Sequence, residues 1–420
     1  AFKQALFATK KHKAAVHVMG LLTDEQSAHA RPEHLYALLD FFRRHDQKEV
    51  YIHLFTDGRD ASPHAAVKFL HDLRLHMKNG EKIATIMGRF YAMDRNKVWK
   101  RTEAAYNAMV MGEGNTAASP EEAINQAYNR GETDEYILPT VIAENGKTVT
   151  KMSAHDAVYF FNARSDRARQ ITKAFVQPHF ETHNPGAFSR SSHPAHLGFV
   201  AMTDFGPDLA GIFTAFPSPD IDNGLAKAIG DRYDQLYISE TEKYAHVTYF
   251  INGGYADPIN GERRELIRSG TIRSYAERPQ MHARELTDKI IEYLKTDKYN
   301  FICVNFPNAD MVGHTGDLTA AKRAISEIDV AVERLVGTVL GKGGQVIVTA
   351  DHGNAEEMIN EKTGEILTEH TTNPVPFIVL RKGKPIKLRS KGILADVAPT
   401  LLKLMNIPQP EEMTGKSLIS

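Results

Sequence analysis

Two Asp–His pairs and a third histidine in the C-terminal half of the sequence could together bind a metal ion. The set offers two carboxylates and three imidazoles: Asp310, His314, Asp351, His352 and His370. Mixed oxygen and nitrogen ligation suits Mn²⁺ or Zn²⁺, and a site that also binds phosphate favours Mn²⁺ or Mg²⁺. A single histidine more often caps a helix or satisfies a loop carbonyl. Five ligand-type residues grouped after two predicted strands favour a metal site instead.

The elements around these residues explain how the side chains could meet. Residues 301–304 and 345–348 are short apolar runs, typical of buried strands of a parallel sheet. Ligands of open α/β sheets bind beyond the carboxyl ends of such strands. Asp310 and His314 are four residues apart, so one helical turn would place them on the same face. This predicted site contains no obvious nucleophile.

A second group of chemically suited residues lies in the N-terminal half, where arginines follow predicted strands. The group comprises Arg59, Asp60, Arg89, Arg95, Arg164, Arg167 and, after the first strand, His29. Guanidinium groups recognise carboxylate and phosphate through paired hydrogen bonds. The alternative is a solvated surface where carboxylates such as Asp57 and Asp166 pair with the arginines. In a chain of net charge −1, this concentration of arginines favours a small, highly anionic substrate.

The overall composition restricts the class of protein. A chain of 420 residues is long enough for two domains. The near-zero net charge gives no general attraction to nucleic acid or to an acidic membrane. Apolar runs stay well below the roughly 18 residues of a membrane span, and a single cysteine, Cys303, excludes an internal disulfide framework. The sequence begins without Met and without the features of a signal peptide.

Alternation of strand-like and helix-like segments predicts an α/β fold with a largely parallel sheet. The predicted strands of the first half are residues 14–18, 50–55, 82–86, 158–161 and 197–202. Two prolines within residues 215–219 predict a linker. Beyond it, Leu286, Ile290 and Leu294 share one helical face, and residues 325–339 form a longer apolar stripe.

A series of motifs extends through the sequence: residues 56–60, 88–95 with Trp99, 164–169, 240–244, 308–315, 349–356, 370–374, 394–400 and 412–416. Taken in order, these motifs resemble the cofactor-independent (2,3-bisphosphoglycerate-independent) phosphoglycerate mutase family of the alkaline phosphatase superfamily. The similarity runs from about Val18 to the last residue. Such an ensemble is far more specific than any one of its members.

The resemblance implies a fold and an activity. The fold would consist of an inserted α/β transferase domain, residues 1–216, and an alkaline-phosphatase-like metal domain, residues 217–420. The reaction would be the interconversion of 3-phosphoglycerate and 2-phosphoglycerate in glycolysis and gluconeogenesis, by phosphoryl transfer through a phosphoserine. Two divalent ions, Mn²⁺ first with Mg²⁺, Zn²⁺ or Co²⁺ as options, would serve as cofactors without 2,3-bisphosphoglycerate. We expect a cytoplasmic monomer acting on a small molecule, with no nucleic-acid or membrane partner.

Residue roles also follow from the resemblance. Asp310, His314 and His370 would hold one metal ion, and Asp351 and His352 would contribute to the other. Phosphoglycerate would be bound by His29, Arg59, Asp60, Arg89, Arg95, Arg164, Arg167 and Lys243. Within that set Lys243, Arg164 and Asp60 are the candidate catalytic residues. Lys243 would lie nearest the transferring phosphate and offset the charge on its oxygens.

Two departures from the family pattern affect these expectations. The family's opening segment, with an Asp-Gly metal motif and the nucleophilic serine, has no counterpart in this sequence. We therefore expect a metal domain that lacks its N-terminal portion, an N-terminally truncated chain, and no turnover by these 420 residues. The loop of residues 24–33 also replaces the family's glycine-rich, two-histidine version and has one inserted residue, which makes His29 a less direct match than the arginines.

Two other functions remain open at this point. A metal-dependent phosphohydrolase or phosphopentomutase of the same superfamily would need the Asp and His ligands but not this set of arginines. A non-catalytic chain that binds phosphoglycerate would agree with the missing serine. Formation of 2-phosphoglycerate, or of free phosphate alone, would separate the mutase from the hydrolase.

Overall fold

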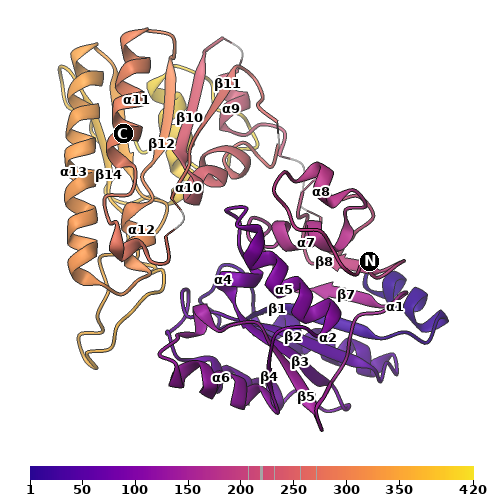
Figure 1. Ribbon diagram of the computed structural model, residues 1–420. Helices are drawn as coiled ribbons and strands as arrows, with labels where there is room; N and C mark the ends of the chain where they lie inside the picture. The colour runs from indigo at the N-terminus through magenta and orange to yellow at the C-terminus, as the bar shows by residue number, and fades with distance from the viewer. Residues whose placement is uncertain (207, 218–220, 231, 256, 271) are drawn as a thin grey trace. The chain divides into compact units, whose positions relative to one another are not determined.

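The structure is a computed structural model that describes residues 1–206, 208–217, 221–230, 232–255, 257–270 and 272–420. The chain divides into two compact units, Ala1–Ser218 and Pro219–Ser420, which we call unit 1 and unit 2 (Figure 1). The predicted linker at residues 215–219 lies partly outside the described residues. Each unit is an α/β structure, and the predicted mainly parallel α/β class is confirmed.

Unit 1 is built on one nine-stranded sheet with the order β4-β5-β3-β2-β1-β7-β8-β9, in which β6 pairs with β5. Its pairings are parallel except those of β5 with β3 and with β6. The strands are β1 Val16–Leu22, β2 Val50–Thr56, β3 Lys82–Gly88, β4 Asn115–Ala117, β5 Thr140–Glu144, β6 Lys147–Thr148, β7 Ala157–Phe160, β8 Gly198–Ala201 and β9 Phe213–Thr214. The three central strands β1, β2 and β3 are almost completely buried, as expected for a parallel sheet covered on both faces.

Helices connect these strands and cover the sheet (Figure 1). They are α1 Phe2–Lys11, α2 Pro32–Arg44, α3 Ala66–Arg74, α4 Arg89–Ala92, α5 Trp99–Met111, α6 Pro120–Asn129, α7 Arg169–Val176 and α8 Phe180–His183, with a 3₁₀ turn η1 at Asp134–Tyr136. Proline at the first position begins both α2 and α6, where its fixed φ suits a helix start. Ser119 caps α6 by accepting a hydrogen bond from the Glu122 backbone.

The core of unit 1 contains one continuous polar line across three strands. Asp156, just before β7, contacts His17 Nε2 of β1 at 3.1 Å, and His17 Nδ1 lies 3.0 Å from His53 Nε2 of β2. His53 Nδ1 lies 2.9 Å from Thr85 Oγ1 of β3. These groups are completely or almost completely buried. Because buried polar groups are costly unless they are paired, the line can form only in one strand register.

Unit 2 has shorter sheets, and here two predictions were wrong. Strands β10 Gln235–Glu240, β11 Glu262–Ile267 and β12 Phe301–Asn305 form a parallel sheet in the order β11-β10-β12. The predicted strand at 345–348 is β13 Gln345–Thr349, but it pairs antiparallel with β14 Phe377–Arg381. Neither β12 nor β13 is fully buried as predicted. Among the described residues each has a paired neighbour on only one side, which leaves part of the strand accessible.

The remaining elements of unit 2 are mainly helical. They are α9 Leu225–Ile229, α10 Thr241–Ala245, a π-helix η2 at His246–Phe250, η3 Tyr275–Glu277, α11 Ala283–Lys295, α12 Asn308–Gly313, α13 Leu318–Gly341, η4 Leu394–Asp396 and α14 Val397–Leu404. Leu286 and Ile290 of α11 are buried as their spacing predicts. The stripe at 325–339 forms part of α13, yet Ile325 is 47% exposed. Within the part of the chain that the structure describes, no helix is long and apolar enough to cross a membrane.

Candidate functional site

Three of the predicted metal ligands in unit 2 converge on a single point. Asp310 lies on α12, and His314 follows the end of that helix one turn later. Their ligand atoms, Asp310 Oδ1 and His314 Nε2, are 3.2 Å apart. His370 Nε2 lies 3.0 Å from the same oxygen and 3.1 Å from His314 Nε2. Separations of this size are expected for atoms that share an ion at bond lengths near 2 Å.

The tautomer of the His314 imidazole agrees with a role as a metal ligand. Its Nδ1 lies 2.6 Å from the Thr368 carbonyl oxygen, which can only accept a hydrogen bond. The Nδ1–H therefore donates, and the lone pair of Nε2 faces Asp310 and His370. Metal-binding histidines are commonly fixed by such a contact to a carbonyl. The donor set thus fits a divalent cation on geometric grounds.

The second predicted pair lies beside this cluster, directly after β13. His352 stacks on His370 with ring centroids 3.8 Å apart. Its Nε2 lies 3.8 Å from Asp310 Oδ1 and 3.6 Å from Asp351 Oδ2. Asp310, His352 and His370 also qualify as a candidate metal-binding group, with one ligand atom from each lying within 4.8 Å of the others. All five ligand-type residues predicted from sequence therefore lie in one cluster.

Lys243 provides a positive charge at the centre of this cluster. It lies on α10, directly after β10, and its side chain is 4% exposed. Its Nζ lies 3.1 Å from Asp310 Oδ2, 3.1 Å from Asp351 Oδ2 and 3.0 Å from His352 Nε2. Burial by itself would raise the pKa of Asp310, but the charges of Lys243 and His314 outweigh it and hold that pKa well below its usual value. Burial would also raise the pKa of Asp351, but the nearby charges, first that of Lys243, outweigh it and lower that pKa.

Several residues that sequence reasoning did not single out hold the ligand loops together. Asn354 Nδ2 donates to the carbonyl oxygens of Thr368 at 3.3 Å and Glu369 at 3.1 Å. Glu356 accepts from the Asn354 backbone at 2.7 Å and from the Thr371 hydroxyl. The loop that carries His352 is therefore tied to the segment that carries His370.

Close packing at a glycine completes this arrangement. A Cβ added at Gly313 would lie 1.6 Å from Asn354 Oδ1. The contact brings α12, which carries Asp310, directly against the loop after β13. A side chain at residue 313 would displace the Asn354 amide from this position.

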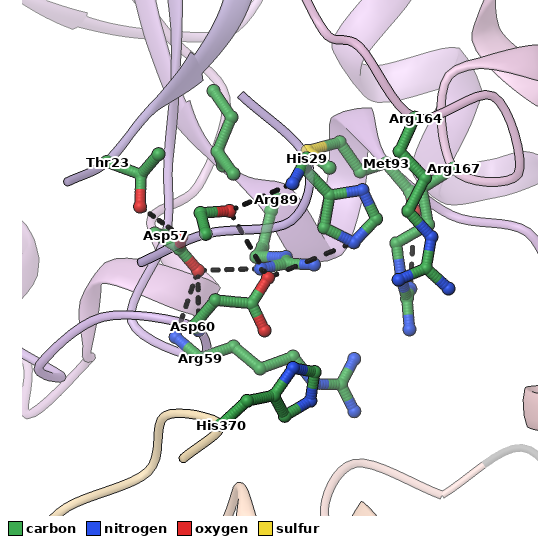
Figure 2. A network of polar contacts seen from close by, with 12 residues as sticks. Thr23, His29, Asp57, Arg59, Asp60, Arg89, Met93, Arg164, Arg167 and His370 are labelled. Carbon is green, nitrogen blue, oxygen red and sulfur yellow. Dashed lines mark hydrogen bonds and ion pairs between the residues drawn. The ribbon is translucent and has the colours of Figure 1, made fainter. Parts of the chain in front are cut away.

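The arginine group in unit 1 forms around a buried guanidinium (Figure 2). Arg89 begins α4 directly after β3 and is 2% exposed. Its Nη1 donates to Asp57 Oδ1 at 2.6 Å and to Asp60 Oδ2 at 2.7 Å. Asp57 also accepts from the Thr23 hydroxyl at 2.6 Å and from the backbone of Asp60 at 2.9 Å. The segments after β1, β2 and β3 are joined in this way at the carboxyl edge of the sheet.

His29 lies against this group, as predicted (Figure 2). Its Nε2 is 3.8 Å from Asp60 Oδ2, and its carbonyl accepts from the Ala163 backbone at 2.7 Å. Burial, followed by the charges of Arg89 and Arg164, lowers the pKa of His29 well below its ordinary value. The imidazole is therefore neutral near pH 7 and can donate from one nitrogen while accepting at the other.

Arg95 and Arg164 form a second centre around one carboxylate. Arg95 Nη1 lies 2.5 Å from Asp166 Oδ2, and Arg164 Nε donates to Asp166 Oδ1 at 2.8 Å. Arg167 Nη1 lies 3.4 Å from the Met93 carbonyl oxygen (Figure 2). The alternative of internal ion pairing thus describes part of this region, since Asp57, Asp60 and Asp166 do pair with arginines.

Arg59 follows β2 and is held differently from the other arginines. Its Nη1 lies 3.6 Å from Glu135 Oε1, and its side chain is 12% exposed. The chain passes closely here, because a Cβ on Gly88 would lie 2.1 Å from the Glu135 carbonyl oxygen. Glu135 was not predicted from sequence, since it lies in a short 3₁₀ turn with no motif around it.

Comparison with known proteins agrees with this geometry. A family model described as the BPG-independent PGAM N-terminus matches residues 1–207. The chain is 44% identical over 423 residues to a 2,3-bisphosphoglycerate-independent phosphoglycerate mutase of Clostridium botulinum, covering all of this chain and 81% of that protein. It is 46% identical over 419 residues to the protein of the same name from Moorella thermoacetica, covering 99% and 80%.

A solved structure is similar over the whole chain as well. It is a crystal structure of Leishmania mexicana phosphoglycerate mutase at low cobalt concentration, with a TM-score of 0.89 and 28% identity. The match covers 100% of this chain and 84% of that one. The identity to the bacterial proteins, over most of their length, places the chain in a family. It belongs to the 2,3-bisphosphoglycerate-independent phosphoglycerate mutases.

Proposed function

We propose that this protein interconverts 3-phosphoglycerate and 2-phosphoglycerate by metal-dependent phosphoryl transfer. In this proposal unit 1 is the substrate-holding transferase domain and unit 2 is the metal domain. The observation that carries the proposal is the convergence of Asp310, His314 and His370 within 3.2 Å of one another beside the buried ammonium of Lys243. A ligand cluster next to a fixed cation suits a transferring phosphoryl group.

In unit 2, the protein groups would bind and orient the phosphoryl oxygens. Two divalent ions would supply Lewis-acid stabilisation, one held by Asp310, His314 and His370 and the other with Asp351 and His352 as ligands. We propose Mn²⁺ as the physiological ion. Lys243 would offset negative charge on the phosphoryl group, and its contacts with Asp310 and Asp351 at 3.1 Å would hold its Nζ in position.

In unit 1, the arginines would hold the glycerate part of the substrate. Guanidinium groups of Arg59, Arg95 and Arg164 suit its carboxylate. Asp60, fixed by Arg89, offers a carboxylate that can take the proton of a substrate hydroxyl, and neutral His29 lies beside it. A hydrolase that releases phosphate has no need of a site built for the second half of its substrate.

The proposal also includes the setting in which the enzyme works. We propose a monomer that acts on a small molecule in the cytoplasm, as part of glycolysis and gluconeogenesis. The reaction would proceed without 2,3-bisphosphoglycerate. Membership of the family supports these proposals.

Titration calorimetry and ³¹P NMR test the proposal together. We expect 3-phosphoglycerate to bind to the full chain in the presence of Mn²⁺, and Arg164→Ala to weaken that binding. NMR then identifies any product. Conversion to 2-phosphoglycerate supports the mutase reaction, and release of phosphate without 2-phosphoglycerate would overturn it in favour of a phosphohydrolase.

A further inference from the structure

One buried carboxylate connects two arginines that come from different loops of unit 1. Arg95 follows α4, whereas Arg164 follows β7. Asp166 uses both of its oxygens: Oδ2 lies 2.5 Å from Arg95 Nη1, and Oδ1 accepts from Arg164 Nε at 2.8 Å. Its side chain is 5% exposed. The contact is therefore a built ion-pair centre and not a surface salt bridge.

The placement of this carboxylate is unexpected on electrostatic grounds alone. A group of arginines gains affinity for an anion from its positive charge, and a buried negative charge among them reduces the field. Its compensating effect is geometric. Two guanidiniums close together repel each other, and a shared carboxylate with charge-assisted hydrogen bonds removes that repulsion and fixes both orientations.

A second tie joins the same two loops. Gln170 of α7 is 5% exposed, and its Nε2 donates to Asp94 Oδ2 at 2.8 Å. Its Oε1 accepts from the Lys97 backbone at 2.9 Å. Asp94 and Lys97 flank Arg95, and α7 directly continues the segment that carries Arg164. Two independent contacts thus hold the loops in one position.

We propose that Asp166 is a positioning residue: it holds Arg95 and Arg164 as one preformed clamp for the anionic substrate, with Gln170 as its support. The inference rests on the proposed function, in which these arginines bind phosphoglycerate. Preorganisation gains affinity because the ligand does not have to order the arginines itself.

The two roles open to Asp166, counter-charge and positioning, predict opposite results for Asp166→Asn. This change keeps the shape of the side chain and removes its negative charge. If Asp166 acts only as a counter-charge, its negative charge weakens anion binding, and Asp166→Asn would therefore tighten that binding. As a positioning residue, its removal releases the arginines and weakens binding, on the order of tenfold to hundredfold for a small displacement of such groups.

The experiment measures the dissociation constant of 3-phosphoglycerate with the full chain by titration calorimetry. We expect weaker binding for Asp166→Asn and also for Asp166→Glu, which keeps the charge but is one methylene longer. A matched control is Asp208→Asn. Asp208 bridges Arg169 and Lys173 on the same helix and is 39% exposed, so binding should change less than about twofold.

The outcomes separate this inference from the function on which it rests. Absence of binding to the unsubstituted chain would count against the proposed function. Binding to the unsubstituted chain that is equal or tighter in Asp166→Asn would overturn the positioning role alone. The midpoint of thermal unfolding, followed by the fluorescence of Trp99, distinguishes a loss of positioning from a general loss of structure.

Gln170→Leu keeps the inference testable should Asp166→Asn fail to fold. This change leaves the charge of the arginine group as it is and removes the second tie. Weaker binding at an unchanged unfolding midpoint would support the clamp, whereas unchanged binding would contradict the coupling of the two loops.

Discussion

Unit 1 and unit 2 differ in how they compensate the charges of their candidate sites. In unit 1 the cations and anions come from the protein itself: Arg89 is held by Asp57 and Asp60, and Arg95 and Arg164 share Asp166. In unit 2 the ligand atoms of Asp310, His314 and His370 face one another at 3.0 to 3.2 Å. The first site is internally balanced, whereas the second, although Lys243 pairs with Asp310 and Asp351, brings together three ligand atoms that suit an added cation.

The two units also differ in how completely their strands and apolar side chains are buried. The central strands of unit 1 are buried on both faces. In unit 2, β13 and β14 are partly accessible, and Ile325 and Ile378 are 47% and 46% exposed. Because burial of apolar surface is the main source of stability, unit 1 should resist unfolding by itself more than unit 2. The single tryptophan, Trp99, reports on unit 1, and the single cysteine, Cys303, reports on unit 2.

The largest expected effect comes from removing the central cation of unit 1. Arg89→Leu would leave the buried carboxylates of Asp57 and Asp60 without their guanidinium. We expect unit 1 to lose about 3–5 kcal/mol of stability, measured by urea unfolding with Trp99 fluorescence. The control is Arg74→Leu, which breaks the exposed pair with Glu121 and should cost less than about 1 kcal/mol. Equal losses would refute the internal balance of the arginine site.

The corresponding change in unit 2 should act on metal binding. Asp310→Ala removes the oxygen that both His314 and His370 face, so we expect Mn²⁺ affinity to fall at least roughly 100-fold. Titration with Mn²⁺ followed by electron paramagnetic resonance measures it. Asp288→Asn, in an exposed pair with Arg334 of the same unit, should leave the affinity as it is. Unchanged Mn²⁺ binding in Asp310→Ala would remove this cluster as the metal site.

Added metal should then distinguish the two units directly. Mn²⁺ at ten times its dissociation constant should stabilise unit 2 by about 1.4 kcal/mol. Burial raises the pKa of the Cys303 thiol to about 12, which keeps it protonated and slow to react in the folded state. We expect Mn²⁺ to slow thiol labelling further and to leave the Trp99 transition in place. A joint shift of both signals would show that the units respond as one.

The smallest expected effect concerns pH and the polar line in the core of unit 1. Burial, followed by the charge of His17, lowers the pKa of His53 well below 6.5. Below pH 6.5, His53 therefore binds a proton in the unfolded chain but stays neutral in the folded unit, and the free energy of unfolding falls as the pH falls. Relative to His53→Leu, the unsubstituted chain should lose up to about 1 kcal/mol between pH 6.5 and 5.5. Parallel pH profiles for the two proteins would contradict this.

Five strands of unit 1, namely β1, β2, β3, β7 and β8, could be predicted because their sequences are mostly apolar, whereas the shorter or more polar β4, β5, β6 and β9 were missed. The runs at 50–55 and 82–86 correspond to β2 and β3. Strand β11, in contrast, is Glu262–Ile267 with two arginines and two glutamates, and no apolar run marks it. An edge strand needs few buried positions, so hydrophobic pattern cannot find it. Strand β14, by contrast, is an apolar run at Phe377–Arg381, but its antiparallel direction relative to β13 depends on the connecting chain and could not be predicted from the run itself.

Residue types predicted the candidate ligands and substrate-binding residues better than they predicted the residues that hold these in place. Aspartate, histidine and arginine after strands are informative by their chemistry, and the structure brings the predicted metal ligands together. Gln170 and Glu356 have no such mark. Gln170 acts through Asp94, 76 residues away in the sequence, and Glu356 acts on Thr371 and Asn373. Contacts between residues so far apart appear only once the chain is folded.

Gly313 gives the ligand spacing of α12 an additional meaning. Any search for similar centres that asks only for Asp and His four residues apart would accept every amino acid at the position before the histidine. A Cβ at residue 313 would lie 1.6 Å from Asn354 Oδ1, so any residue other than glycine would require the Asn354 side chain, which binds the Thr368 and Glu369 carbonyls, to move. A more selective pattern for this centre is therefore Asp-x-x-Gly-His with a downstream asparagine, because the glycine leaves room for the asparagine that ties the two ligand loops together.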